Sequence, residues 1–272
     1  MKGKLHMSNI KKSTKLLKTF LDDNFKNLTL KEQLEQFKNF DFSLLGEKQF
    51  CHSDSTDIAK AVYYIIWHDK LPNMRTLEEM DKYYGGETLN TFNTLFQSEL
   101  NGIKKFINQE TDNKFFEQIK QFKKKYSTIG NFMLLPALLF DRMSINQKKG
   151  NYSYKYKDYF DLFAVALFQT DEFSELKKAN DFYFSKIDEK QFCKINFLEN
   201  YFKNNKFSVI YNHDYYNGIY YPYYHWKYDN PELHKNEYIE FAKSYMQKAS
   251  KIIDYRACKM CEELYKNLKE IK

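Results

Sequence analysis

Ser127-Thr-Ile-Gly-Asn-Phe-Met-Leu-Leu-Pro136 is the stretch of sequence that decides the fold, because turn-forming and apolar residues alternate in it too tightly for a plain helix. Gly130 and Asn131 predict a tight turn, since both residue types tolerate positive φ. The run 132–135 is apolar, which predicts a strand around 131–135, and Pro136 can neither continue a helix nor donate a ladder hydrogen bond. We therefore expect a bend followed by a short buried strand.

Two polar segments follow this strand. Ser144 is a suitable N-cap for one helical turn that ends at Gly150, a residue type favoured just after a helix. Farther along, apolar positions with helical spacing begin near residue 155 and place Asp158 and Asp161 in the first turns of a helix, on one face. These two carboxylates could bind a metal or act as a base, or they could cap the helix and pair with neighbouring lysines.

The composition predicts a mainly α-helical protein. Only 8 Gly and 4 Pro occur in 272 residues, which favours few tight loops, and 25 Phe and 23 Tyr predict a core built from aromatic rings. The sequence contains no internal repeat and no low-complexity linker. We therefore expect a single domain over residues 1–272, with a mobile N-terminus over 1–8.

Helix signals recur along the chain. Capping boxes begin at Thr29 and Thr76, and the helix after Thr76 is expected to end at Gly85-Gly86. Hydrophobic spacing predicts further helices over 9–25, 55–68, 88–108 and 112–125, and a long C-terminal helix within 231–272. A β-hairpin is expected over 207–222, because Asn217-Gly218 is a favourable two-residue turn.

Positive charge is concentrated in two segments. The net charge is +7, yet residues 1–21 carry six lysines and no acid, and residues 118–157 carry nine basic residues and one acid. The rest of the chain is therefore acidic. A coding bias toward lysine raises the lysine content everywhere and does not separate charge in this way. We expect a basic patch over the central segment, and such patches attract phosphate groups.

Several polar and basic residues of the central segment are candidates for binding phosphate or nucleic acid: Asn131, Arg142, Ser144, Asn146, Lys148 and Lys149. Lysines near a helix end can hold a phosphate, and amide or hydroxyl groups can complete the site. In the alternative interpretation, Asn131 fills the turn, Ser144 caps a helix and Asn146 bonds a loop carbonyl. The coincidence of these residues with the concentrated charge favours binding.

Cysteine usage and hydropathy predict a cytoplasmic protein. Four cysteines occur without a signal peptide, and no run approaches 18 apolar residues, so we expect no membrane partner. Cys258 and Cys261 have the spacing of half a zinc site, but they fall inside a helical pattern with no second pair nearby. Ordinary helix cysteines explain them better, and we expect no metal and no cofactor.

The central motifs resemble a family of uncharacterised bacterial proteins that carry a domain of unknown function. That family reads T-I-G-N-F, then I-N-Q-x-R-G, then D-x-F-D-L, and the matching positions are 128–132, 145–150 and 158–162. Lys149 and Tyr159 stand where the family has arginine, which weakens any phosphate clamp because a planar bidentate donor is lost. The resemblance implies kinship of fold over roughly 60–260 and no established activity.

A second, fainter similarity is to the C-terminal motif of HNH-type nucleases, which read I-G-N-L-T-L-L before further asparagines. Ile129-Gly130-Asn131 and Asn146 match parts of that pattern. A metal-dependent nuclease needs a histidine base and metal ligands beside the asparagine. His68 is the upstream candidate, and Asp158 and Asp161 are the candidate acids.

Three functions are consistent with these patterns. The first is a bacterial or phage-borne protein that binds nucleic acid or another polyphosphate through the 118–157 patch. The second is a protein-interaction module, such as a toxin, an antitoxin or an inhibitor of a phage-defence system. The third is the HNH-like nuclease. The phosphate-binding loop, dinucleotide-binding, nucleophile-elbow and H-E-x-x-H motifs are all missing from the sequence, which excludes those enzyme classes but does not decide whether the chain is an enzyme.

Overall fold

The computed structural model describes residues 2–49, 52–90, 113–137, 160–211 and 231–270, and it places side chains over 7–49, 52–90, 113–137, 160–211, 239–240 and 242–270. The predicted hairpin turn at Asn217-Gly218 lies outside these residues. Nearly all of the helix predicted over 88–108 also lies outside them. Its first position, Thr88, is the last residue of a strand.

The described chain is mainly α-helical, as predicted, with two small antiparallel two-stranded sheets. The helices and strands are α1 (Lys2–Asn24), α2 (Leu30–Phe37), α3 (Ser43–Gln49), η1 (Ser53–Ser55), α4 (Asp57–Trp67), α5 (Leu77–Tyr83), β1 (Tyr84–Thr88), α7 (Asn113–Tyr126), η3 (Ile129–Asn131), β2 (Phe132–Pro136), α11 (Phe160–Gln169), α12 (Ser174–Ala179), α13 (Asp181–Phe184), α14 (Glu189–Ile195), η4 (Glu199–Tyr201), β3 (Phe202–Lys203), β4 (Lys206–Phe207) and α17 (Pro231–Glu270).

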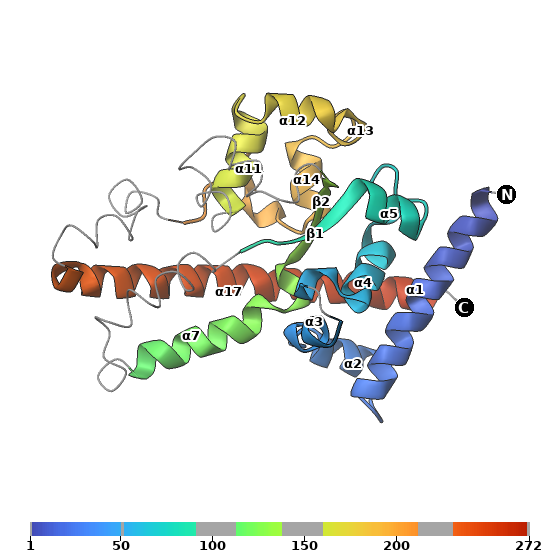
Figure 1. Cartoon of the computed structure of the whole chain (residues 1–272), viewed down its shortest axis with the longest axis horizontal. Helices are drawn as coiled ribbons and strands as arrows, with labels where there is room; N and C mark the ends of the chain where they lie inside the picture. The colour runs from blue at the N-terminus through green and yellow to red at the C-terminus, as the bar shows by residue number, and fades with distance from the viewer. Residues whose placement is uncertain (1, 50–51, 91–112, 138–159, 212–230, 271–272) are drawn as a thin grey trace.

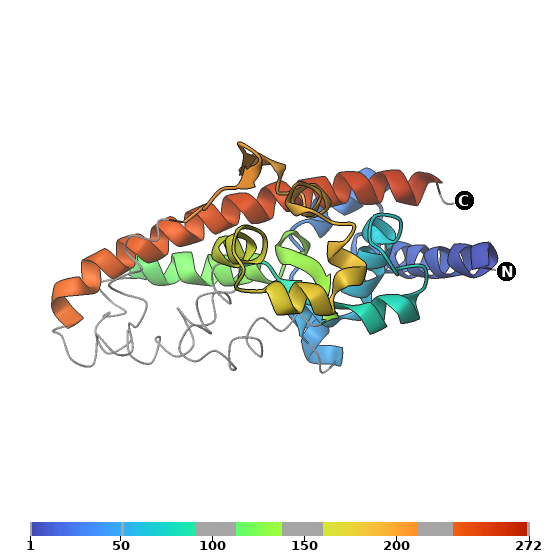
Figure 2. The ribbon, with the colours of Figure 1, turned by 90° about the horizontal axis from the view of Figure 1, so that it is seen from above.

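The long C-terminal helix α17 is the element against which the rest of the chain is arranged (Figure 1). Its 40 residues correspond to about 60 Å at the rise of an α-helix. It contacts η3, α7, α4 and α2, which come from widely separated parts of the sequence. One face of α17 is buried along most of its length: Ala242, Tyr245, Met246, Ala249, Ile252, Ile253, Arg256, Ala257, Met260, Leu264 and Leu268. Figure 2 shows α1 and the last turns of α17 at the same end of the molecule.

The predicted central strand is present as β2, and every residue in it is buried. It pairs in antiparallel fashion with β1, so that Gly85 lies opposite Leu135 and Gly86 opposite Leu134. The helix predicted to end at Gly85-Gly86 ends at Tyr83, and the two glycines lie within β1, a strand that was not predicted. A Cβ on Gly86 would lie 2.4 Å from the carbonyl oxygen of Asp54, so glycine permits a close approach of two backbones.

The described hairpin lies earlier in the chain than the predicted one. β3 and β4 pair Phe202 with Phe207 and Lys203 with Lys206. The two turn residues, Asn204 and Asn205, have φ values of 51° and 61°. Positive φ at both central positions is the requirement of a type I′ turn, and asparagine meets it at small cost.

The N-terminal half of the chain follows its capping signals. Thr29 and Glu32 form the predicted capping box of α2, and Thr76 caps α5 by accepting from the Glu79 amide. Helix α1 begins at Lys2, so residues 2–8, which were expected to be mobile, are helical. Among the described helices, none has a stretch long and apolar enough to cross a membrane.

The packing of η3 against α17 generates a test. A Cβ on Gly130 would lie 2.1 Å from the carbonyl oxygen of Ile253 and 2.8 Å from the Ala257 side chain. Backbone atoms cannot move aside, so we expect Gly130→Ala to lower the free energy of unfolding by about 3 kcal/mol or more. Urea denaturation measures this change, with the exposed α17 substitution Lys266→Ala as control. Equal stability of Gly130→Ala and the parent would contradict the contact.

Candidate functional site

A buried arginine holds the central bend against α17. Arg256 is fully buried, and its Nε donates to the Asn196 carbonyl at 2.8 Å. Its two terminal nitrogens donate to the carbonyls of Gly130 and Phe132, the latter at 2.7 Å. Burial lowers the pKa of Arg256 to about 9, so the guanidinium keeps its charge at neutral pH. Carbonyl dipoles from three backbone positions stabilise this buried charge.

Asn131 has a structural role in the bend. Its side chain is completely buried, and its Oδ1 accepts from the Asn90 backbone amide at 3.0 Å. Its Nδ2 donates to the carbonyls of Asn90 and Tyr126, at 3.1 and 2.9 Å. Asn90 in turn accepts from the Tyr211 hydroxyl at 2.6 Å. The structure corrects the expectation that Asn131 presents its amide to a phosphate, because the amide is used inside the protein.

Asp161 is also used internally. It is completely buried, and one carboxylate oxygen accepts from the backbone amides of Ile210 and Tyr211, at 2.8 and 3.0 Å. The other oxygen accepts from the Leu162 amide at 2.8 Å. These bonds anchor the 210–211 backbone to the start of α11. A carboxylate enclosed in this way is not placed to act as an acid or base on a ligand at the surface.

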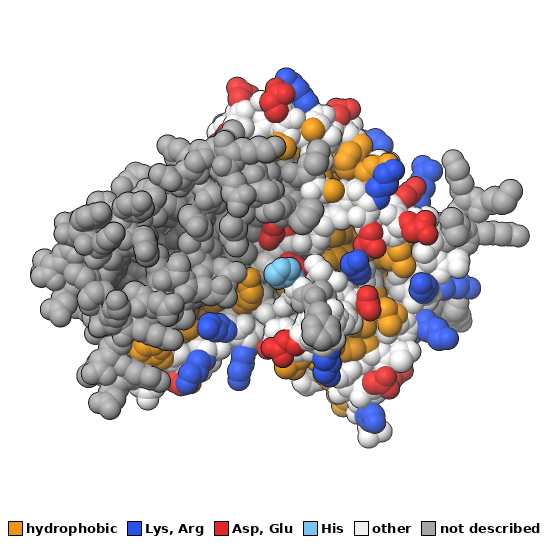
Figure 3. Space-filling model, in the orientation of Figure 1, with side chains coloured by type: hydrophobic (Ala, Val, Ile, Leu, Met, Phe, Trp, Pro, Cys, Tyr) orange, Lys and Arg blue, Asp and Glu red, His pale blue; other side chains and the backbone are white. Residues whose placement is uncertain are grey.

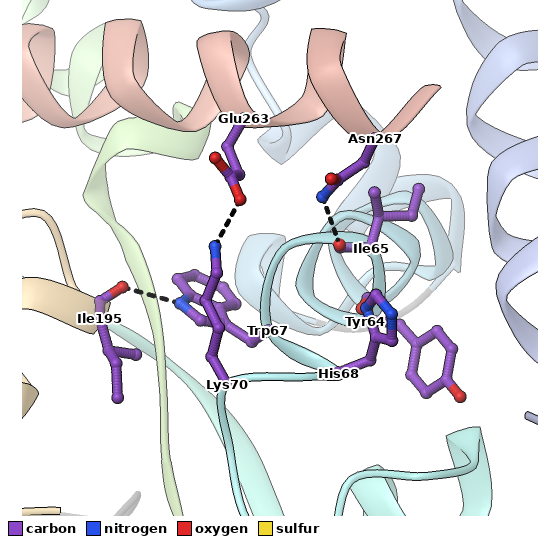
Figure 4. Close-up of polar contacts among 8 residues, drawn as sticks. All are labelled: Tyr64, Ile65, Trp67, His68, Lys70, Ile195, Glu263 and Asn267. Atoms are coloured by element: carbon purple, nitrogen blue, oxygen red, sulfur yellow. Dashed lines mark hydrogen bonds and ion pairs between the residues drawn. The ribbon is translucent and has the colours of Figure 1, made fainter. Parts of the chain in front are cut away.

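His68 forms the C-cap of α4 and is partly buried there (Figure 4). Its Nδ1 lies 3.0 Å from the Tyr64 carbonyl, and its ring stacks on the Tyr64 ring with centroids 5.6 Å apart. Lys70, just beyond this helix end, forms an ion pair with Glu263 of α17 at 2.7 Å. His68 therefore lies at a helix end that packs on α17.

Two further bonds in Figure 4 fix the same helix end. Trp67 Nε1 donates to the Ile195 carbonyl at 2.9 Å, which joins α4 to α14. Asn267 Nδ2 donates to the Ile65 carbonyl at 2.9 Å, which joins α17 to α4. The tryptophan-containing helix end is thus part of the framework.

The two α17 cysteines are free thiols in different environments. Cys258 is partly buried, and its Sγ accepts from Lys38 Nζ at 3.6 Å. Cys261 is buried, which raises the pKa of its thiol to about 12. Among the described residues, no group of three His, Cys, Asp or Glu side chains is arranged to hold a metal ion.

Most of the predicted phosphate-binding residues lie outside the described residues: Arg142, Ser144, Asn146, Lys148 and Lys149, together with the candidate acid Asp158. The basic segment is described over residues 118–137, and its basic side chains there all lie in the second half of α7. Lys120, Lys123 and Lys124 are exposed on this helix, whose apolar face buries Phe115, Ile119 and Phe122. Figure 3 shows basic side chains gathered along the edge of the molecule over α7.

Acidic residues neutralise this face only in part. Lys120 pairs with Glu117 at 2.6 Å on the solvent-exposed surface, and Lys125 pairs with Asp254 of α17 at 2.5 Å. Exposed ion pairs of this kind contribute only about 0–1 kcal/mol. Within the described residues, no acid pairs with Lys123 or Lys124. An anion arriving at α7 therefore meets positive charge that is weakly compensated.

Helices α7 and α17 run side by side (Figures 1 and 2). Side chains of both helices line a groove between them. It has a volume of about 260 Å³ and is lined by Gln118, Gln121, Phe122 and Lys125 of α7 and by Lys243, Met246, Gln247 and Ser250 of α17. This groove could not be predicted from the sequence, because its two walls are more than 100 residues apart in the chain. The sequence does show that Gln118, Gln121 and Lys125 recur at helical spacing, which predicts a polar face on α7.

Comparisons of the chain with known protein families, with curated proteins and with solved structures find no match.

The Arg256 contacts predict the effect of its removal. Arg256→Met leaves the carbonyls of Gly130, Phe132 and Asn196 buried without this donor. We expect a loss of about 3 kcal/mol or more in the free energy of unfolding, since an unsatisfied buried polar group costs about 1–3 kcal/mol. Chemical denaturation measures it. Lys266→Met, at an exposed position of α17, is the control and should change stability by less than about 0.5 kcal/mol. A native-like stability of Arg256→Met would show that the arginine does not hold the bend.

The thiol environments predict a labelling order. Burial raises the pKa of Cys193 and of Cys261 to about 12, whereas Cys258 is partly exposed beside Lys38. Because the thiolate is the reactive form, native Cys258 should react with N-ethylmaleimide at least about tenfold faster than the two buried thiols. Peptide mass spectrometry gives the three rates, and the urea-unfolded chain provides the control. Protection of Cys258 and Cys261 that a chelator abolishes would instead indicate a metal.

Proposed function

We propose that this protein binds nucleic acid or another polyphosphate through the basic surface of α7. The observation that carries the proposal is the exposure of Lys120, Lys123 and Lys124 on one short helix, beside the partly buried Lys125. Only Glu117 opposes them within α7. The proposal places this bacterial or phage-borne protein in the bacterial cytoplasm, where the free thiols of Cys193, Cys258 and Cys261 stay reduced.

The chemistry of lysine sets the kind of binding. An ammonium group attracts phosphate as a point charge and lacks the planar fork with which arginine reads a base edge. Contacts from these lysines would position a phosphate backbone without specifying its sequence. Their affinity should come from the release of counterions and should fall steeply as salt is added.

The nuclease and the interaction module receive less support. The nuclease needs an accessible Asn131, whose amide is buried and bonded to Asn90 and Tyr126. The interaction module needs a continuous apolar surface. The large apolar side chains that are exposed in the described residues include Met7 and Leu16, which are nine residues apart and so lie on opposite sides of α1.

Charge reversal on α7 tests the proposal. We expect Lys120→Glu/Lys123→Glu/Lys124→Glu to weaken binding of a fluorescent oligonucleotide by at least about tenfold at 50 mM salt, because three phosphate contacts are lost. The salt dependence of the logarithm of the binding constant should become shallower by about 2–3. Fluorescence anisotropy between about 50 and 200 mM salt measures both quantities.

The matched control is Lys178→Glu/Lys186→Glu/Lys190→Glu, which changes the net charge by the same amount. These lysines are also exposed, and Lys178 pairs with Glu175 as Lys120 pairs with Glu117. Equal weakening by both triple variants would show that only overall charge matters. That result, or an unmodified chain that binds neither RNA nor DNA, would refute the proposed site.

A further inference from the structure

The groove between α7 and α17 has polar walls and an apolar floor. Gln118, Gln121 and Lys125 follow at intervals of three and four residues on α7, so they share one helix face. Gln247 and Ser250 occupy the facing wall on α17. The floor consists of two side chains that are almost completely buried, Phe122 and Met246. Several amides around one hollow can donate and accept hydrogen bonds together.

One of these amides lacks an internal partner. The Oε1 atom of Gln118 is shielded from solvent and accepts no hydrogen bond from the described residues. A buried acceptor without a donor is destabilising, and such atoms are uncommon in folded proteins. Because Gln118 lines the groove, its amide can turn toward it, and there an incoming N–H or O–H group could donate to Oε1. The ligand should therefore present hydrogen-bond donors to α7.

The rim of the groove is cationic. Lys125 and Lys243 lie at its edges, each in an ion pair with a neighbouring acid, Asp254 and Glu240. Both pairs are partly exposed, so their mutual attraction is weak enough for a phosphate to replace the carboxylate. The groove thus offers amide groups within and ammonium groups at the rim.

From this arrangement we infer that the groove accepts an unpaired nucleotide, so that the protein prefers single-stranded to double-stranded nucleic acid. The inference rests on the proposed function and deepens it. The base edge faces Gln118, Gln121 and Gln247, and the flanking phosphates face Lys125 and Lys243. Amide side chains pair with the donor and acceptor groups of base edges.

The shape of the surface explains the preference for a single strand. The exposed lysines of α7 are on a convex helix and can meet the backbone of either form. The amides are recessed between two helices, and only a base that has left its stack can reach them. A duplex would gain the electrostatic attraction alone, whereas a single strand gains the amide contacts as well.

The test compares two substitutions in the groove with one outside it. Gln118→Leu removes the orphan acceptor and keeps the side-chain size, so the variant should be at least as stable as the parent. Gln247→Leu changes an exposed wall residue and cannot disturb the core. Gln36→Leu, on the exposed side of α2, is the control. Anisotropy is measured with a labelled oligonucleotide of mixed sequence, alone and annealed to its complement.

We expect Gln118→Leu and Gln247→Leu to weaken single-strand binding about tenfold and about threefold, and to leave duplex binding and the control unchanged. Equal effects on both nucleic acids, or no effect of either variant, would overturn the inference. Tighter binding of duplex than of single strand by the unmodified chain would also overturn it. Failure of the inference would leave the proposed function open to its own test. The α7 lysine triple variant should weaken binding of single-stranded and of double-stranded nucleic acid alike.

Discussion

The hydrogen bonds from Arg256 to three backbone carbonyls are the constraint on which the rest of the structure depends. One planar cation joins α17 to the bend at Gly130, to the start of β2 at Phe132 and to the end of α14 at Asn196. A buried charge is tolerated only where polar groups surround it, and here the peptide dipoles replace an acidic partner. The bend must come this close to α17, which only a residue without a side chain allows. Through β2 the same contact positions β1 and the segment that contains Asp54.

Local patterns predicted the elements that local physics determines. The apolar run before Pro136 is a buried strand, the capping box at Thr29 starts a helix, and the periodicity after Pro231 continues as one long helix. These features depend on neighbours within a few residues. The pairing of Gly85 and Gly86 in a strand depends instead on the distant segment β2, and Gly86 also fits closely against the backbone of Asp54. The spacing of the glycines reveals neither contact.

The candidate site was only partly predictable, because polar residues in a motif serve either a ligand or the backbone. Asn131 and Asp161 have the residue types expected of a binding site, yet their side chains satisfy amides and carbonyls where the chain changes direction. The lysines of α7 could be recognised from the sequence, since charge that is clustered on a helix stays at the surface. The facing amides could not, because a groove between α7 and α17 exists only after distant segments meet.

The position of α17 has a consequence for the synthesis of the chain. Of the described elements it is the last to leave the ribosome, yet it supplies the arginine for the bend, the asparagine that bonds Ile65 and the acid that pairs with Lys125. Until it emerges, η3 and the side of α4 that contacts α17 remain uncovered. Such dependence on contacts that are remote in sequence slows folding and leaves apolar surface exposed for longer. The nascent polypeptide therefore completes this core only after α17 has left the ribosome, and until then it exposes apolar surface of the kind that chaperones bind.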